Sequence, residues 1–227
     1  MRQIPLGVRL QDRTVFASFL PGDNGLALTA LQHMADGSGD RTMFLHGATG
    51  SGKSHLLQAL CAAVAGSAYF PLAQLLASGP DVLEGADRLA AVALDDVHVV
   101  VGSTPWERRL FSLYNECEVH GTRLVISARP PAAGLGVVLP DLRSRLSSMP
   151  HFALHPLDEA QQREALQLRA AQRGLELPDE TVRYLQRRYA RDMSSMQALL
   201  DKLDAASLEE QRRLTVPFIR QVTGELP

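Results

Sequence analysis

The 227-residue chain has 45% apolar residues and a formal net charge of −2, values typical of a folded protein with one large or two small domains. The near-neutral charge argues against a broad basic face, so we expect direct DNA contact to be weak or absent. No apolar run reaches the ~20 residues of a membrane span and the two cysteines lack metal-site spacing, so we expect a cytoplasmic protein with reduced, buried thiols.

The first 24 residues form an arm without hydrophobic periodicity, and a helix is predicted over 26–34. From residue 43 onward, short apolar runs alternate with helical stretches. We predict strands over 43–46, 68–71, 89–94, 123–127 and 152–154. This alternation is typical of parallel βαβ units, in which the site lies at the carboxyl ends of the strands. The predicted fold class is therefore α/β, with a parallel sheet flanked by helices.

The pattern becomes purely helical after Pro156. Helices are predicted over 158–174, from Pro178, from Asp192 and over 214–222, with apolar side chains at helical spacing. The predicted organisation is an arm (1–24), an α/β domain (25–155) and a small helical domain (156–227).

One short segment matches the phosphate-binding pattern G-x-x-x-x-G-K-[ST], between a predicted strand and a predicted helix. Its residues are Gly47, Ala48, Thr49, Gly50, Ser51, Gly52, Lys53 and Ser54. The glycines allow backbone N–H groups to curl around phosphate oxygens. Lys53 is expected to reach the β- and γ-phosphates and the Ser54 hydroxyl to hold Mg²⁺. The sequence therefore predicts a nucleoside triphosphate site.

Two further strands end in polar residues. Asp95 and Asp96 follow the strand predicted over 89–94; Asp95 is expected to hold Mg²⁺, and Asp96 to orient or activate a water. Ser127 ends the next strand and could hydrogen-bond the γ-phosphate or the attacking water, although a turn-forming serine is an equal alternative.

Arg143 and Arg145 lie on a predicted short helix after a proline-bounded loop. Either guanidinium could stabilise phosphoryl-transfer charge, in its own subunit or across a subunit boundary. A solvated basic turn is the alternative on composition alone.

Together these motifs resemble the AAA+ module of the replication initiator DnaA. The resemblance implies that Asp95 and Asp96 are the Walker B acids, that Ser127 is sensor 1, and that Arg145 is an arginine finger acting on a neighbour's nucleotide. It also counts His55 with the phosphate loop as a nucleotide-binding residue. The segment 16–24 is similar to the family's adenine-wrapping segment, which implies that Leu20, Pro21 and Asn24 line the adenine.

Within this family the chain looks like the Hda regulators, which bind the sliding clamp and trigger hydrolysis of DnaA-bound ATP. DnaA ends in a helix-turn-helix domain, which we do not expect here because the resemblance accounts for nearly the whole chain. The implied cofactors are ADP or ATP with Mg²⁺, and the implied partners are DnaA and the DNA polymerase III sliding clamp. Intrinsic ATPase activity is expected to be weak or absent, and self-association is left open.

The N-terminus contains a candidate clamp-binding peptide, formed by Gln3, Ile4, Pro5, Leu6, Gly7 and Val8. A clamp ligand needs a hydrogen-bonding glutamine and apolar side chains that alternate along an extended segment. Ile4, Leu6 and Val8 alternate in this way, and Pro5 favours an extended backbone. The peptide departs from the usual Gln-Leu-x-Leu-Pro-Leu form in the positions of its proline and glycine.

A second departure concerns sensor 2, an arginine that normally contacts the phosphates from the third helix of the lid. Ser194 takes its place here, and a serine is short and uncharged. Arg191 lies three residues earlier, on the same helix face, and is the candidate to compensate.

Two alternative functions share the phosphate loop. A helicase loader of the same fold would bind single-stranded DNA, with a basic stripe such as Arg183, Arg187 and Arg188. A stand-alone kinase or metabolic ATPase would need an acceptor pocket, and no residues beyond the nucleotide motifs indicate one.

Overall fold

The computed structural model describes residues 14–172, 174–188, 202–203, 206 and 215–223. The chain divides into two compact units with the boundary after Pro156. Each unit has its own hydrophobic core, and each is described separately below.

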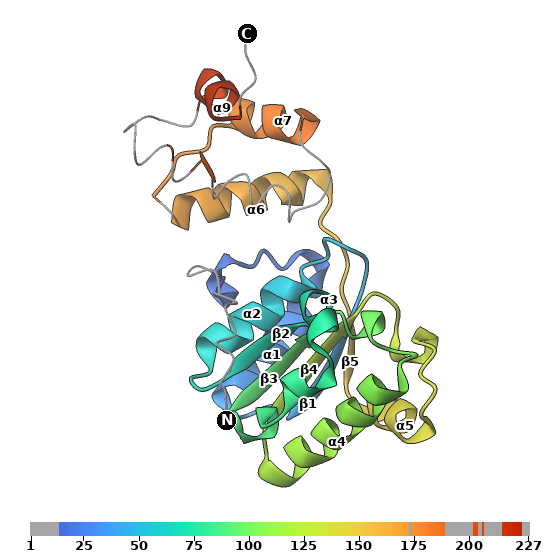
Figure 1. The fold of residues 1–227 in the computed structure, drawn as a ribbon. Helices are drawn as coiled ribbons and strands as arrows, with labels where there is room; N and C mark the ends of the chain where they lie inside the picture. Colours follow the sequence, from blue (N-terminus) through green and yellow to red (C-terminus); the bar gives the residue numbers. More distant parts are fainter. Residues whose placement is uncertain (1–13, 173, 189–201, 204–205, 207–214, 224–227) are drawn as a thin grey trace. The chain divides into compact units, whose positions relative to one another are not determined.

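A five-stranded parallel sheet forms the centre of the first unit (Figure 1). Its strands lie in the order β2-β3-β4-β1-β5, so β1 is next to β4 and β5. The strands are β1 (Thr42–His46), β2 (Ala68–Pro71), β3 (Ala91–Asp95), β4 (Arg123–Ala128) and β5 (His151–Ala153). The predicted α/β fold with a parallel sheet is confirmed, and each predicted strand is present to within two residues at either end, the usual uncertainty at element boundaries.

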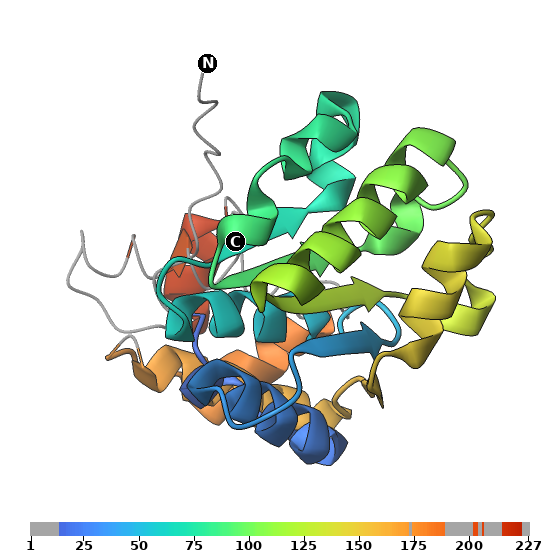
Figure 2. The ribbon, with the colours of Figure 1, turned by 90° about the horizontal axis from the view of Figure 1, so that it is seen from below.

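Helices cover both faces of the sheet (Figure 2). The helices of this unit are α1 (Gly25–Asp36), α2 (Lys53–Ala63), α3 (Leu72–Leu75), α4 (Thr104–His120) and α5 (Pro140–Ser148). Helices α1 and α2 pack on one face, whereas α4 and α5 pack on the other.

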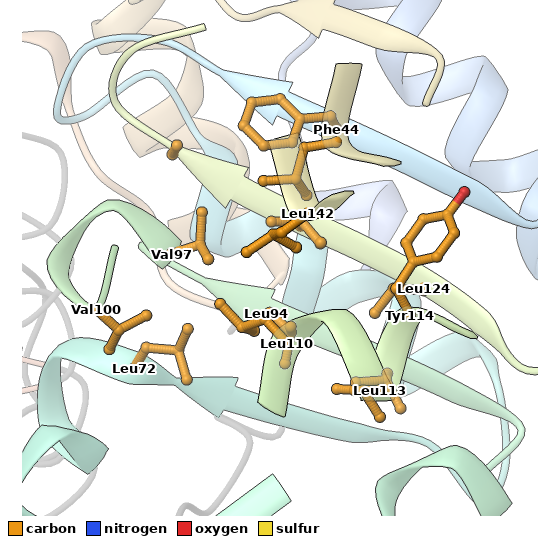
Figure 3. Close-up of a cluster of buried hydrophobic side chains, with 14 of the residues drawn as sticks. Phe44, Leu72, Leu94, Val97, Val100, Leu110, Leu113, Tyr114, Leu124 and Leu142 are labelled. Carbon is orange, nitrogen blue, oxygen red and sulfur yellow. The ribbon is translucent and has the colours of Figure 1, made fainter. Parts of the chain in front are cut away.

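The two faces separate by the alternation of side chains along each strand. On β3, Val92 and Leu94 point into the core beneath α4, while Ala91 and Ala93 point toward α2. Figure 3 shows the α4-side core, where Leu94 lies among side chains from β4, α4 and α5. Because both faces are buried, the strands read as continuous apolar runs in the sequence.

This sheet order brings three polar strand ends together. Strands β3, β4 and β1 are neighbours and all run in the same direction. The phosphate loop follows β1, the two acids lie at and after the end of β3, and Ser127 lies near the end of β4. The predicted site residues therefore lie along one edge of the sheet.

The second unit contains the helices α6 (Glu159–Gln172), α7 (Asp179–Arg188) and α9 (Val216–Val222). Asp158 and Gln161 begin α6 with a reciprocal pair of bonds, because each side chain accepts the backbone N–H of the other, at 3.0 and 2.8 Å. The core of the unit includes Leu166, Leu185 and Phe218. Most of the helix predicted from Asp192 lies outside the described residues.

Both cysteines are buried in helices of the first unit and neither forms a disulfide. Burial raises the pKa of Cys61 to about 11 and that of Cys117 to about 12, so both thiols stay protonated near neutral pH. Among the helices that the structure describes, none has the length and apolar character required to cross a membrane.

Candidate nucleotide site

The phosphate loop connects β1 to α2, and two of its glycines are required by close packing. A Cβ atom on Gly47 would lie 2.2 Å from the carbonyl oxygen of Leu154, and one on Gly52 would lie 2.6 Å from the ring of Phe19. Gly52 also has a φ of 95°, in the left-handed region, at the start of α2. Substitution of either glycine would therefore displace the loop backbone.

The ammonium group of Lys53 lies inside this loop and is almost completely buried. It donates hydrogen bonds to the carbonyl oxygens of Gly47 and Ala48, at 2.7 and 2.9 Å. Burial lowers the pKa of Lys53, while the carboxylates of Asp96 and Asp95 act in the opposite direction. The loop therefore holds a cation at its centre and leaves Ala48, Thr49 and Ser54 exposed.

Tyr69 on β2 links the two predicted Mg²⁺ ligands. Its hydroxyl group donates to Asp95 Oδ2 at 2.6 Å, and the side chains of Ser54 and Gln58 also hydrogen-bond to this hydroxyl. Burial, followed by the charge of Asp95, raises the pKa of Tyr69 well above its usual value. Ser54 and Asp95 therefore lie around one phenol group. Tyr69 is a site residue that the sequence pattern does not indicate.

Ser127 lies between the two acids and is fully buried. Its hydroxyl group donates to Asp95 Oδ1 and accepts the backbone N–H of Asp96, the latter at 3.0 Å. Because the single hydroxyl proton is used within this cluster, Ser127 here positions Asp95 and Asp96. Its direct contact with a phosphate or water stays a prediction.

Asp96 has an unusual backbone conformation, with φ 59° and ψ 44°. Among the described residues it is the only one other than glycine with a positive φ, and such a conformation often marks a functional position. Burial, and then the charge of Asp95, raises the pKa of Asp96. A carboxylate with a raised pKa is a better proton acceptor, as the predicted role toward a water requires.

His98 and Arg129 extend this cluster. The guanidinium group of Arg129 donates through Nε to His98 Nε2 at 2.6 Å. Because an arginine can only donate, His98 Nε2 must accept, and the imidazole proton is then on Nδ1. That nitrogen lies 3.8 Å from Asp96 Oδ1. Neither residue was identified from the sequence.

His55 connects the arm to α2. Its Nε2 lies 3.1 Å from both the carbonyl oxygen of Val15 and the hydroxyl group of Ser18. Its ring also packs against that of Phe19, with the centroids 5.4 Å apart. The structure thus assigns His55 a contact with the arm, and its predicted contact with nucleotide is untested.

The predicted adenine residues Leu20, Pro21 and Asn24 closely follow Phe19, whose ring lies against Gly52 of the phosphate loop. This contact holds the segment beside the loop. Leu20 and Pro21 are half-buried. Asn24 is buried, and its side chain pairs with the backbone of His155: Nδ2 donates to the carbonyl oxygen at 2.9 Å, and Oδ1 accepts the N–H at 2.8 Å. Asn24 therefore fixes the end of the arm to the segment after β5, and its contact with adenine stays a prediction.

The two arginines of α5 have different surroundings. Arg143 donates to the carbonyl oxygen of Val137, at 3.2 Å from Nε and 2.5 Å from Nη2. Arg145 lies over the ring of Tyr114, 5.4 Å from its centroid, and 3.6 Å from the carboxylate of Glu118. The side chain of Arg145 nevertheless stays 41% exposed.

The position of Arg145 separates it from its own phosphate loop. Glu118 lies in the last turn of α4, which leads into the amino end of β4. The phosphate loop follows the carboxyl end of β1, and β1 and β4 are parallel. Arg145 and the phosphate loop therefore lie toward opposite ends of the sheet.

Several predicted site residues lie outside the part that the structure describes. These are the clamp peptide residues Gln3 to Val8, the candidate Arg191 and Ser194 at the sensor 2 position.

The residues that are described fit a nucleotide with its divalent cation. Gly50 and Gly52 have positive φ values, which allow the loop backbone to curl around phosphate oxygens. Lys53 supplies positive charge, and Ser54 and Asp95 supply oxygen ligands of the kind that Mg²⁺ prefers. Over the described residues, no group of three or more His, Cys, Asp or Glu side chains could hold a metal ion by itself. A bound Mg²⁺ would therefore need phosphate oxygens as further ligands.

Two family models match parts of the chain. The lid domain of Hda matches residues 158–223, and the ATPase domain of bacterial DnaA matches residues 10–70. The second match includes the later part of the arm, β1 and the phosphate loop.

The fold is also similar to solved structures. Domain III of Thermotoga maritima DnaA has a TM-score of 0.73 at 20% identity, covering 96% of this chain and 98% of that one. AMPPCP-bound DnaA from Aquifex aeolicus has a TM-score of 0.68 at 18% identity, covering 88% and 68%. A Thermotoga maritima RuvB variant has a TM-score of 0.60 at 14% identity, covering 95% and 73%.

The parallel sheet, the phosphate loop and the acids at the strand ends form a P-loop domain with the AAA+ fold seen in DnaA domain III. The two family matches then narrow the class, because one falls in the nucleotide unit and the other in the helical unit. The chain is a AAA+ protein related to Hda and DnaA.

Proposed function

We propose that this chain is a regulator of replication initiation that stimulates hydrolysis of DnaA-bound ATP by presenting Arg145 in trans. The position of Arg145 carries the proposal, because its partly exposed side chain lies on α5, toward the opposite end of the sheet from the chain's own phosphate loop. Because this position is away from the chain's own phosphate loop, a nucleotide held by another subunit is the target that we propose for Arg145. The match of residues 158–223 to the Hda lid domain supports a regulator of this kind.

Arg145 would stabilise the charge that develops on the transferring phosphoryl group in DnaA. Its planar fork of donors matches phosphate oxygens, and an arginine supplied in trans can accelerate such hydrolysis by about 10³–10⁵-fold. The contacts with Tyr114 and Glu118 limit the rotamers that Arg145 can adopt. Partial ordering of this kind reduces the entropy lost when the finger enters the partner's site.

The chain's own site would bind ADP or ATP with Mg²⁺, and the nucleotide would stabilise the regulatory conformation. The glycine backbone and Lys53 would hold the phosphates, and Ser54 and Asp95 would hold Mg²⁺, which neutralises phosphate charge when bound. Asp96 would orient a water, although we propose that hydrolysis in this chain is slow. Leu20, Pro21 and Asn24 of the arm would line the base.

The N-terminal peptide would dock the regulator on the DNA polymerase III sliding clamp. Docking raises the effective concentration of Arg145 near DnaA without any new contact to the nucleotide. We therefore expect Gln3→Ala or Leu6→Ala to reduce clamp-dependent stimulation to within about twofold of the rate without clamp. Gln11→Ala, which changes a glutamine outside the peptide, is the matched control. Full stimulation by both peptide variants would refute clamp docking through this segment.

Arg191 is proposed to replace the missing sensor 2 arginine. Arg191→Ala is expected to weaken ADP binding by about tenfold, since a hydrogen bond to a charged group contributes about 1.5–3 kcal/mol. Arg183→Ala on α7 serves as the control, and equilibrium titration with a fluorescent ADP analogue gives both dissociation constants. An unchanged dissociation constant for Arg191→Ala rules out the compensation.

Single-turnover hydrolysis of ATP bound to DnaA tests the function as a whole. We expect this chain to accelerate the reaction in the presence of DNA-loaded clamp. We also propose a cytoplasmic location, because both cysteines are free thiols. No acceleration, together with salt-sensitive binding of single-stranded DNA by the isolated chain, would favour a helicase loader instead.

A further inference from the structure

The carboxylate of Glu107, in the first turn of α4, is the centre of a buried hydrogen-bond cluster. The residue is 1% exposed, and its oxygens accept three backbone N–H groups. Gly102 donates at 2.8 Å, Val138 at 3.0 and 3.1 Å, and Leu139 at 2.6 Å. A buried carboxylate is costly unless its oxygens are satisfied, and here three donors satisfy it.

Two separate segments meet at this carboxylate. Gly102 lies near the end of the segment that follows Asp96 and precedes α4, whereas Val138 and Leu139 lead into α5. Burial alone would raise the pKa of Glu107, but the bonds from Val138, Gly102 and Leu139 lower it below the usual value. The carboxylate is therefore ionised, and charge-assisted bonds of this kind are stronger than neutral ones.

The start of α5 has no side-chain cap of its own. Its N-cap residue is Leu139, which has no side-chain acceptor, and its first helical residue is Pro140. Glu107 instead holds the backbone of Leu139 from the neighbouring helix. The negative charge also lies beside the amino end of α5, where the helix dipole favours it.

The same helix contacts Arg145 further along. Tyr114 and Glu118, which hold the guanidinium group, are seven and eleven residues after Glu107. Residues at this spacing lie on one face of a helix. One face of α4 thus fixes both the beginning of α5, through Glu107, and the finger that α5 carries.

We propose that Glu107 is a positioning residue for Arg145: it fixes the entry of α5 and thereby sets where the arginine finger is presented to DnaA. This inference rests on the proposed trans role of Arg145. It adds that the finger's rate enhancement depends on a carboxylate that touches neither nucleotide nor partner.

The test is single-turnover hydrolysis of DnaA-bound ATP with DNA-loaded clamp, measured over a range of concentrations of this chain. Glu107→Gln is expected to lower the maximal stimulated rate by about tenfold or more, because misplacement of a catalytic group by about 1 Å can cost about 10²-fold. The concentration for half-maximal stimulation should stay within about twofold, because the docking surfaces are unchanged. Glu116→Gln, a half-exposed glutamate of α4 paired with Arg109, is the matched control.

Nucleotide affinity separates positioning from a general loss of structure. If Glu107 acts through Arg145, Glu107→Gln binds ADP as tightly as the wild type, because none of the Glu107 hydrogen bonds involves the phosphate loop. Weakened ADP binding, or a changed half-maximal concentration with an unchanged maximal rate, would overturn the proposal. So would full activity of Glu107→Gln. If Arg145→Ala itself keeps full stimulation, the proposed function fails instead, so the two failures are distinguishable.

If Glu107→Gln does not fold, a second variant tests whether Glu107 positions Arg145. Leu139 has a φ of −73°, which a proline can adopt. Leu139→Pro removes the shortest N–H donor to Glu107 while keeping the carboxylate, and it should also reduce the maximal rate. A folded Leu139→Pro protein with the full maximal rate would contradict the positioning role.

Discussion

Arg145→Ala is expected to abolish stimulation of DnaA, reducing the hydrolysis rate by about 10³-fold or to DnaA's own slow rate. The reason is that the variant removes the only group proposed to enter the partner's nucleotide site. Binding of nucleotide to this chain should not change, since Arg145 lies toward the other end of the sheet from the phosphate loop. Rapid-quench measurement of ADP formed on DnaA gives the rate.

Two controls define what the loss means. Arg108→Ala removes another exposed arginine, on α4, and should leave stimulation intact. Arg145→Lys should restore only a small part of it, because a lysine lacks the planar fork that matches phosphate oxygens. Wild-type stimulation by Arg145→Ala would show that this arginine is not the finger.

Lys53→Ala is expected to weaken the binding of both ADP and ATP to this chain by about a hundredfold. The ammonium group lies inside the phosphate loop with its donors directed at loop carbonyls, and phosphate oxygens would be stronger, charged acceptors. Lys202→Ala is a fitting control because Lys202 is the chain's other lysine. Isothermal titration calorimetry measures both affinities. Unchanged binding by Lys53→Ala would mean that the loop does not hold the phosphates.

The same variant separates the role proposed for bound nucleotide from that of Arg145. If bound nucleotide stabilises the regulatory conformation, Lys53→Ala should also stimulate DnaA less at concentrations of nucleotide that saturate the wild type. Raising the nucleotide concentration should then restore stimulation, which loss of Arg145 would not allow.

Much of the site could be predicted because its signals are local in the sequence. The phosphate loop needs particular residues at fixed spacing, and Asp95 and Asp96 directly follow an apolar run. Parallel strands end at a common edge, so the approximate meeting of these residues followed from the βαβ pattern alone.

Residues whose role depends on strand order could not be predicted in this way. Tyr69 reads as an ordinary strand residue, and its contact with Asp95 exists because β2 pairs with β3. His98 and Arg129 are far apart in the sequence, and they meet because β3 pairs with β4. Glu107 looks like a solvent-facing residue of a helix, yet it is buried against the loop before α5.

The location of Ser127 could be predicted from the sequence, but its hydrogen bonds could not. Its position at the end of β4, beside the acids, follows from the sequence pattern. The bonds to Asp95 and Asp96 depend on a register between β3 and β4 that the sequence does not specify. A serine at this position can therefore position the acids themselves, in addition to any contact with a phosphate.

The most direct test of the central claim is to ask which bound nucleotide is consumed. DnaA is loaded with ATP carrying one label and this chain with ATP carrying another, and both ADP products are followed in one single-turnover reaction with DNA-loaded clamp. The account predicts that the DnaA label is converted rapidly, while the label on this chain is converted slowly or not at all. Rapid conversion of this chain's own label, with that of DnaA unaffected, would contradict it.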